Sequence, residues 1–172
     1  LLYEVSKRQV WDVAAADSVG LEKWYKANKK QYAWEQPRFK GFVMHCKDAK
    51  QAKLVKKMLK QHAESDWRKQ LKQQFNKDSV TVSISGPYLC MKGENRYVDA
   101  LAFKTGKKVE PLKGYAVSDV YGKVMKQPKS YLDVKAQVTN DYQSQKEKEW
   151  VEALRKEFSF SVDESVLKTV KP

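Results

Sequence analysis

The first 36 residues carry apolar side chains every three or four positions, which is the spacing of helices that bury one face. The pattern restarts after Asp17, and Ser18 is a suitable N-cap for a second helix. Pro37 ends the second helix because the residue before a proline avoids the helical region. We therefore predict that segment 1–36 is a helical hairpin linking into the next domain.

Segment 37–127 mixes strand and helix patterns. Val80 to Ser85 alternate apolar with polar residues, as a half-buried strand does. Gly86-Pro87 predicts a turn, and Gly122 predicts a bulge or a close backbone approach within a strand. In order, the patterns predict a strand (39–46), two helices (after Asp48 and around Trp67 to Phe75), a strand (80–85), a short helix (98–103) and a strand (115–125).

Segment 128–172 shows the longest helical pattern, with apolar positions from Tyr131 to Phe158. Alternation at Phe160 and Val162 predicts a short strand after this helix. The whole order predicts an α+β fold, in which helices cover a small sheet. A helical hairpin precedes this sheet domain, and a long helix with a short strand follows it.

The composition narrows the class of protein. The chain has 172 residues and a net charge of +13, from 34 basic and 21 acidic side chains. At 41% hydrophobic it can build a core, so it is not a disordered polycation. No apolar run is long enough to span a membrane. The chain begins at Leu1-Leu2 without a methionine, which indicates a piece of a longer or processed protein.

The charge favours polyanions, but the lysines are spread along the chain and arginine, the usual base reader, is scarce. No zinc finger or RNA-recognition motif is present, so we do not expect specific nucleic-acid recognition.

Residues with catalytic or metal-binding chemistry are few. Cys46 and Cys90 form no C-x-x-C pair, and His45 and His62 complete no zinc pattern, so we expect no metal and no cofactor. The cysteines are either two buried hydrophobes or one disulfide in an oxidising compartment. His45 and Cys46 are neighbours in a strand and point to opposite faces, so they cannot form a catalytic pair.

Aromatic residues are dense near the end of the first segment. Trp24, Tyr25, Tyr32 and Trp34 lie within eleven positions. Most aromatic side chains serve a core. An aromatic surface that holds extended polypeptide is the alternative for this group.

The segment from Pro37 to Val120 resembles a parvulin-type peptidyl-prolyl isomerase domain. Phe42-Val43-Met44-His45-Cys46-Lys47-Asp48 is similar to the opening strand of that family, and Val98 to Gly106 is similar to its segment ending in Ala-Phe and a Gly. Gly114-Tyr115-Ala116-Val117 falls where the family's closing strand begins. The resemblance implies a parvulin-like domain over 37–127.

The flanking segments resemble parts of SurA-type periplasmic chaperones. Asp17 to Leu21, followed by Trp24-Tyr25, is similar to the helical linker that enters such domains. Residues 141–162 are similar to the C-terminal helix and strand, which in those proteins pack on an N-terminal chaperone domain that we expect to be missing here. The resemblance implies export to the periplasm or cell envelope.

Departures from the family affect the predicted site. The two histidines of a parvulin fall on Val43 and Ala116 in this sequence, and the proline-pocket phenylalanine falls near Val98. His45 lies two residues beyond Val43 on the same strand face and is the candidate catalytic residue. The peptide-binding residues that the resemblance implies are Val43, Met91, Val98, Phe103 and Tyr115.

The sequence therefore predicts a folding factor that binds unfolded or extended polypeptides, chiefly envelope proteins, with weak or no isomerase turnover. An active prolyl isomerase that uses His45 is the first alternative. The alternative of another class is a basic module that docks on nucleic acid or an anionic surface.

Overall fold

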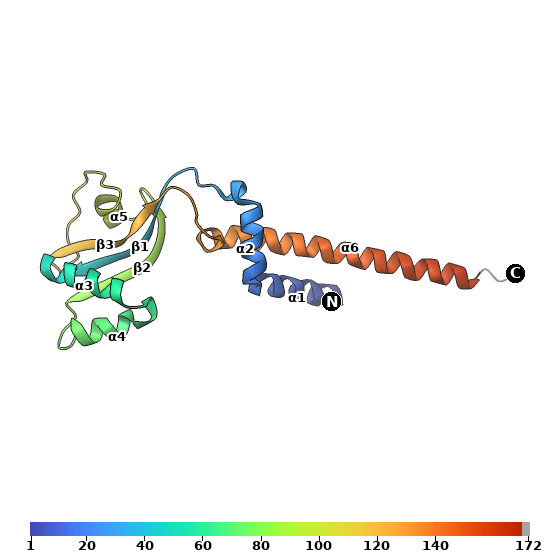
Figure 1. The fold of residues 1–172 in the computed structure, drawn as a ribbon, viewed down its shortest axis with the longest axis horizontal. Coiled ribbons are helices and arrows are strands. Elements are labelled where there is room, and N and C mark those ends of the chain that lie inside the picture. The colour runs from blue at the N-terminus through green and yellow to red at the C-terminus, as the bar shows by residue number, and fades with distance from the viewer. Residues whose placement is uncertain (170–172) are drawn as a thin grey trace. The chain divides into compact units, whose positions relative to one another are not determined.

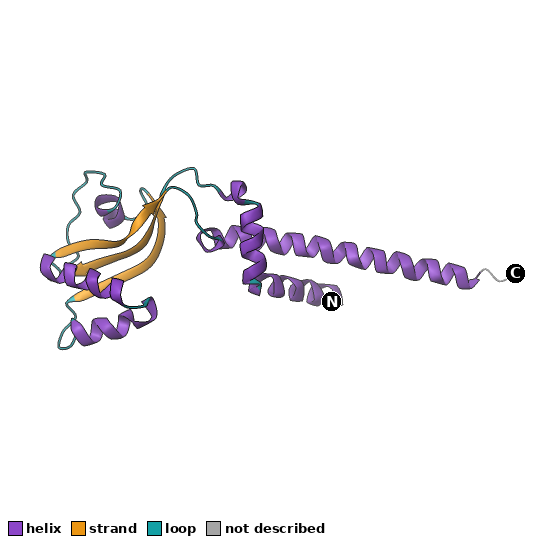
Figure 2. Ribbon diagram, in the orientation of Figure 1, coloured by secondary structure: helices purple, strands orange, loops and turns teal. Residues whose placement is uncertain are grey.

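The computed structural model describes residues 1–169, and it describes side chains as far as residue 159. The fold is α+β: the described residues form six α-helices, two 3-10 helices and a three-stranded antiparallel sheet (Figures 1 and 2). The chain divides into two compact units. Residues 1–33 and the segment from Pro128 onward make one, the helical unit, and Trp34–Gln127 make the other, the sheet unit. The first and third predicted segments thus join in one unit.

In the helical unit, α1 lies along α6, so that two ends of the chain share one structure (Figure 1). Asp17, not Ser18, is the N-cap of α2, because its Oδ1 accepts a hydrogen bond from the Gly20 amide at 2.9 Å. The elements are α1 (Leu2–Ala16), α2 (Ser18–Ala27), η1 (Lys29–Tyr32), η2 (Tyr131–Val134) and α6 (Lys135–Thr169).

The aromatic residues near the end of the first segment serve as core. Tyr25 and Tyr32 are 2% and 3% exposed, and Trp34 is also buried. The Tyr25 hydroxyl donates to the Pro128 carbonyl at 3.0 Å, and the Tyr32 hydroxyl donates to Asp141 Oδ2 at 2.6 Å. Each polar tip has a partner inside the unit, as buried tyrosines require. The alternative of a surface that grips polypeptide is therefore wrong for these three residues.

The predicted strand at Phe160 and Val162 is also wrong, because the backbone there continues α6. No proline or glycine interrupts the sequence between Lys135 and Thr169, so nothing stops the helix. Two apolar residues two positions apart were too little to distinguish a strand from a helix.

In the sheet unit, β1 pairs with β2 on one side and β3 on the other. Helices α3 and α4 cover one face of this sheet and α5 covers the other (Figure 2). The elements are β1 (Arg38–Cys46), α3 (Ala49–Gln61), α4 (Glu64–Gln74), β2 (Val82–Met91), α5 (Arg96–Leu101) and β3 (Val117–Met125).

Strand β1 contributes side chains to two separate hydrophobic cores, one on each face of the sheet. Met44 and Cys46 pack with α3, while Phe39 and Val43 pack with Cys90 and α5. Cys46 and Cys90 therefore lie on opposite faces of the sheet, and both are free thiols. Burial raises the pKa of both, that of Cys46 to about 11. The disulfide alternative is excluded in this fold, and both cysteines act as small hydrophobes.

Two glycines that lie opposite each other in β1 and β3 let these strands approach closely. Gly41 of β1 lies opposite Gly122 of β3, and a Cβ at Gly122 (φ +150°) would overlap the Lys40 carbonyl oxygen. The register of β1 against β2 shifts at the same level, between Gly41 and Val43. The predicted close approach at Gly122 is confirmed. The turn predicted at Gly86-Pro87 is wrong, because β2 runs through both residues.

Candidate functional site

The predicted catalytic residue, His45, lies on the α5 face of the sheet. It is opposite Ser118 of β3, and its Nδ1 is hydrogen-bonded to Ser118 Oγ at 2.7 Å. The rings of Tyr97 and Tyr115 lie against the imidazole, with centroids 4.7 and 5.9 Å away. The site is therefore a histidine and serine pair held between two tyrosines.

This arrangement hides the imidazole. His45 is only 5% exposed. Burial lowers its pKa, and the nearby positive charge of Arg96 lowers it further. The ring is neutral at neutral pH. A general acid or base must come within hydrogen-bonding distance of its substrate, and His45 presents almost no surface to one.

The structure brings together four of the five predicted peptide-binding residues. Val43 (1% exposed) and Val98 (fully buried) belong to the core under α5, and the half-buried Phe103 packs against them. Tyr115 lies against His45. Met91 is separate, because its strand neighbour Cys90 points into that core and adjacent strand residues point to opposite faces.

The position that corresponds to the second parvulin histidine, Ala116, also offers no catalytic side chain. Ala116 is exposed, and its amide donates to the Cys46 carbonyl at 3.1 Å. Its part in the structure is therefore a backbone contact where β3 begins. Around His45, the side chains fill the space under α5 as a core, with Val43 and Val98 at its centre.

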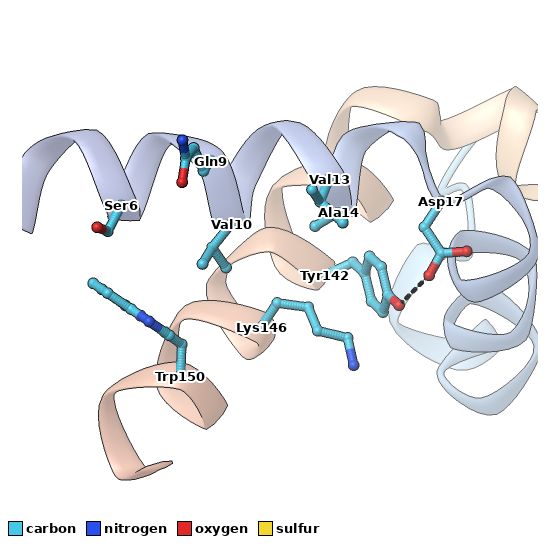
Figure 3. Close-up of a pocket in the computed structure, with 9 residues that line it drawn as sticks. All are labelled: Ser6, Gln9, Val10, Val13, Ala14, Asp17, Tyr142, Lys146 and Trp150. Atoms are coloured by element: carbon cyan, nitrogen blue, oxygen red, sulfur yellow. Dashed lines mark hydrogen bonds between the residues drawn. The ribbon is translucent and has the colours of Figure 1, made fainter. Parts of the chain in front are cut away.

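A pocket lies elsewhere, between α1 and α6 of the helical unit (Figure 3). Its volume is about 430 Å³. Val10 of α1 lies on the side of Trp150, while Val13 and Ala14 lie nearer Tyr142 (Figure 3). The other lining residues are Ser6, Gln9, Asp17 and Lys146.

The two ends of this pocket differ. The Trp150 ring lies at one end, where it contacts Tyr3 with ring centroids 5.5 Å apart. At the other end the Tyr142 hydroxyl donates to Asp17 Oδ2 at 2.7 Å (Figure 3). This bond, together with the Gly20 amide, holds the pKa of Asp17 below its usual value. The carboxylate therefore stays charged and fixed where α1 meets α2.

Exposed apolar side chains also occur on α1 and α6, the two helices that line the pocket. Val13 is 71% exposed and Phe158 is 72% exposed. Leu1, Leu2, Tyr3, Val5 and Leu154 are also exposed. Isolated apolar residues on a surface are common, but here Val13 lines the pocket and Tyr3 contacts its residue Trp150.

Sequence reasoning missed this pocket. The signal was present in α6, where Tyr142, Lys146 and Trp150 recur every four residues and so share a face. The partner, α1, lies more than 120 positions earlier in the chain. No local pattern shows that these two helices meet.

Within residues 1–169, none of the helices combines the length and the apolar character that crossing a bilayer requires. Within residues 1–159, histidine, cysteine and carboxylate side chains do not gather in threes that could hold a metal ion. Comparisons with family models, with curated proteins and with solved structures found no match.

Proposed function

We propose that this protein is an exported folding factor of the peptidyl-prolyl isomerase/SurA type that binds unfolded or extended polypeptide. It works in the periplasm on envelope proteins, needs no cofactor and has weak or no isomerase turnover. The observation that carries the proposal is the pocket between α1 and α6, with the exposed apolar side chains of these two helices. The place in the cell rests on the sequence resemblance alone.

The pocket suits apolar side chains of an unfolded chain. Its volume of about 430 Å³ is within the range of small-ligand sites, so it can take one or two large side chains. Apolar contact is non-directional and does not demand one sequence. A folding factor needs this tolerance because its clients share exposed apolar residues and little else.

The arrangement of elements supports the same class. Strand β1 is followed by helices, and β3 begins just after Gly114-Tyr115. This is the order that the resemblance to parvulins implies for segment 37–127. The sheet unit is inserted between two segments that together build the helical unit.

Weak turnover is the expectation because the sheet unit offers little for catalysis. Rotation about a peptide bond meets a barrier of about 18–20 kcal/mol. Lowering it requires an open apolar pocket and polar groups that favour the twisted amide. His45 is buried and bonded to Ser118, while Val43 and Val98 are core.

Binding is tested with a permanently unfolded client, such as a reduced and carboxymethylated protein, titrated with the full chain. Val13→Gln places an amide at the edge of the pocket and keeps a good helix former. We expect the Kd to rise about threefold to tenfold, because roughly 1 kcal/mol of apolar contact is lost. Val19→Gln is the matched control: Val19 is 63% exposed in α2 of the same unit and does not line the pocket. Equal affinity for the two variants would refute the pocket as the binding site.

Turnover is tested by following cis-to-trans conversion of an X-Pro peptide with the wild-type chain and with His45→Ala. We expect little or no acceleration, and the same rate with both proteins. Acceleration that His45→Ala abolishes would establish the alternative, an active isomerase with His45 in its site.

A further inference from the structure

Positive charge is concentrated in the sheet unit. Between residues 34 and 127, 20 lysines and arginines outnumber nine acidic residues, which gives +11 of the chain's +13. The helical unit holds the remaining +2. The proposed binding of clients by the helical unit leaves this charge unexplained.

The charge is ordered on α3. Lys50, Lys53, Lys57 and Lys60 are all exposed and recur every three or four residues, so they share one side of the helix, which we call the lysine face. The opposite side of α3 is buried against the sheet by Ala52, Val55, Met58 and Leu59. The lysine face therefore points away from the core.

Among the side chains that the structure describes, no carboxylate is paired with this face. Lys56, at its flank, is paired with Asp119 Oδ2 at 2.6 Å. Within residues 1–159, none of the four lysines of the lysine face has such a partner. Arg68, Lys69 and Lys72 of the adjacent helix α4 are exposed and add to the charge. Glu64 and Asp66 lie in the first turn of α4, where they complement its dipole.

An apolar side chain lies beside the lysines. Leu54 falls between Lys50 and Lys57 on the helix and is 49% exposed. Binding to a membrane surface combines the attraction of lysines to anionic headgroups with burial of apolar side chains in the interface, and the lysine face with Leu54 offers both.

We propose that the lysine face of α3, with Leu54, binds the surface of a bilayer that contains anionic phospholipid. Lipid fits better than nucleic acid for two reasons. Nucleic-acid surfaces favour arginine, whose fork matches phosphates and base edges, but the sheet unit has 17 lysines and three arginines. An exposed leucine also gains nothing against a sugar-phosphate backbone.

The helix is ready to bind. Asp48 caps α3 by accepting a hydrogen bond from the Gln51 amide at 2.7 Å, and the buried side of α3 holds it on the sheet. Binding therefore does not carry the free-energy cost of ordering the chain, which a disordered basic segment has when it folds on binding. The lysine face covers about 15 Å of helix, enough for several headgroups at once.

The test is sedimentation of the full chain with vesicles of mixed phosphatidylglycerol and phosphatidylcholine, compared with phosphatidylcholine alone. We expect binding to the anionic vesicles only, weakened by added salt. One lysine near an anionic surface contributes about a fivefold factor in partitioning. Lys53→Gln combined with Lys57→Gln should therefore weaken binding roughly 25-fold.

The matched control is Lys107→Gln combined with Lys108→Gln, which removes the same charge from an exposed loop of the same unit. It should change binding less than about threefold, because salt screens charges beyond a Debye length of about 8 Å. Leu54→Ser alone should also weaken vesicle binding relative to the wild-type chain, while its circular dichroism spectrum stays unchanged. An equal loss in both double variants, no binding to anionic vesicles, or tighter binding to a DNA or RNA oligonucleotide at the same salt would overturn the proposal.

Discussion

His45 shows how the surroundings of one residue determine its role. An imidazole can serve as a catalyst when it reaches solvent, but here it is 5% exposed and bonded to Ser118. Burial, and then the charge of Arg96, lower its pKa from the usual value of 6.5. His45 is therefore a buried neutral histidine of the sheet, and its main expected effect is on stability.

This effect depends on pH in a fixed direction. Below pH 6.5 the unfolded chain binds a proton at His45 that the folded protein resists, so the unfolded state holds more protons. The free energy of unfolding should then fall as the pH falls from 6.5 toward the lower pKa of the folded state. In His45→Gln this contribution is absent, so urea melts from pH 7.5 to 5.5 should show a flatter profile. Identical slopes for wild type and His45→Gln would contradict the prediction.

At the scale of elements, the sequence predicted each helix and strand where spacing and breakers agreed. The strand ending at Cys46, the helix capped by Asp48 and the glycine approach at Gly122 all follow from local rules. The errors at Gly86-Pro87 and Phe160 have one physical cause. Whether a proline sits within a strand, or a helix runs on, depends on neighbours that short sequence windows do not contain.

The candidate sites show the same limit. The resemblance assigned Val43, Val98 and Phe103 to one peptide site, and in the structure these three side chains pack in one cluster. It did not show that they fill a core, because burial depends on how closely α5 packs on the sheet. The pocket between α1 and α6 forms only where two segments distant in the sequence come into contact. No sequence motif predicts that contact.

Docking of α1 on α6 yields a prediction about Glu147. Its Oε2 accepts a hydrogen bond from Trp11 Nε1 at 2.9 Å, and its Oε1 lies 3.2 Å from Lys7 Nζ. Loss of the charged acceptor in Glu147→Ala should weaken the docking by about 1–2 kcal/mol. Hydrogen exchange should then show faster exchange of α1 amides, with α3 unchanged.

Glu147→Gln is the informative comparison. The amide oxygen can still accept from Trp11, so this variant should protect α1 more than Glu147→Ala does. If both variants exchange as slowly as wild type, Glu147 does not hold the helices together. If α3 also exchanges faster, the change acts beyond the helical unit.

At the scale of the whole molecule, the first and last residues of the sheet unit are hydrogen-bonded to each other. The Trp34 amide donates to Gln127 Oε1 at 2.8 Å, and Gln127 Nε2 donates to the Trp34 carbonyl at 3.1 Å. Arg38 also pairs with Met125 across β1 and β3, so the two ends of the unit are adjacent. A domain with its own cores and adjacent ends can fold alone.

We therefore expect excised residues 34–127 to fold, with dispersed amide resonances and a single cooperative thermal transition. Gln127→Ala should lower its midpoint, because it removes both hydrogen bonds that join the ends. The excised unit also separates the two proposals. It retains the lysine face and lacks the pocket, so it should bind anionic vesicles but not the unfolded client. A folded excised unit that bound the client as tightly as the full chain would place client binding in the sheet unit, whereas an unfolded one would mean that the sheet unit depends on the helical unit.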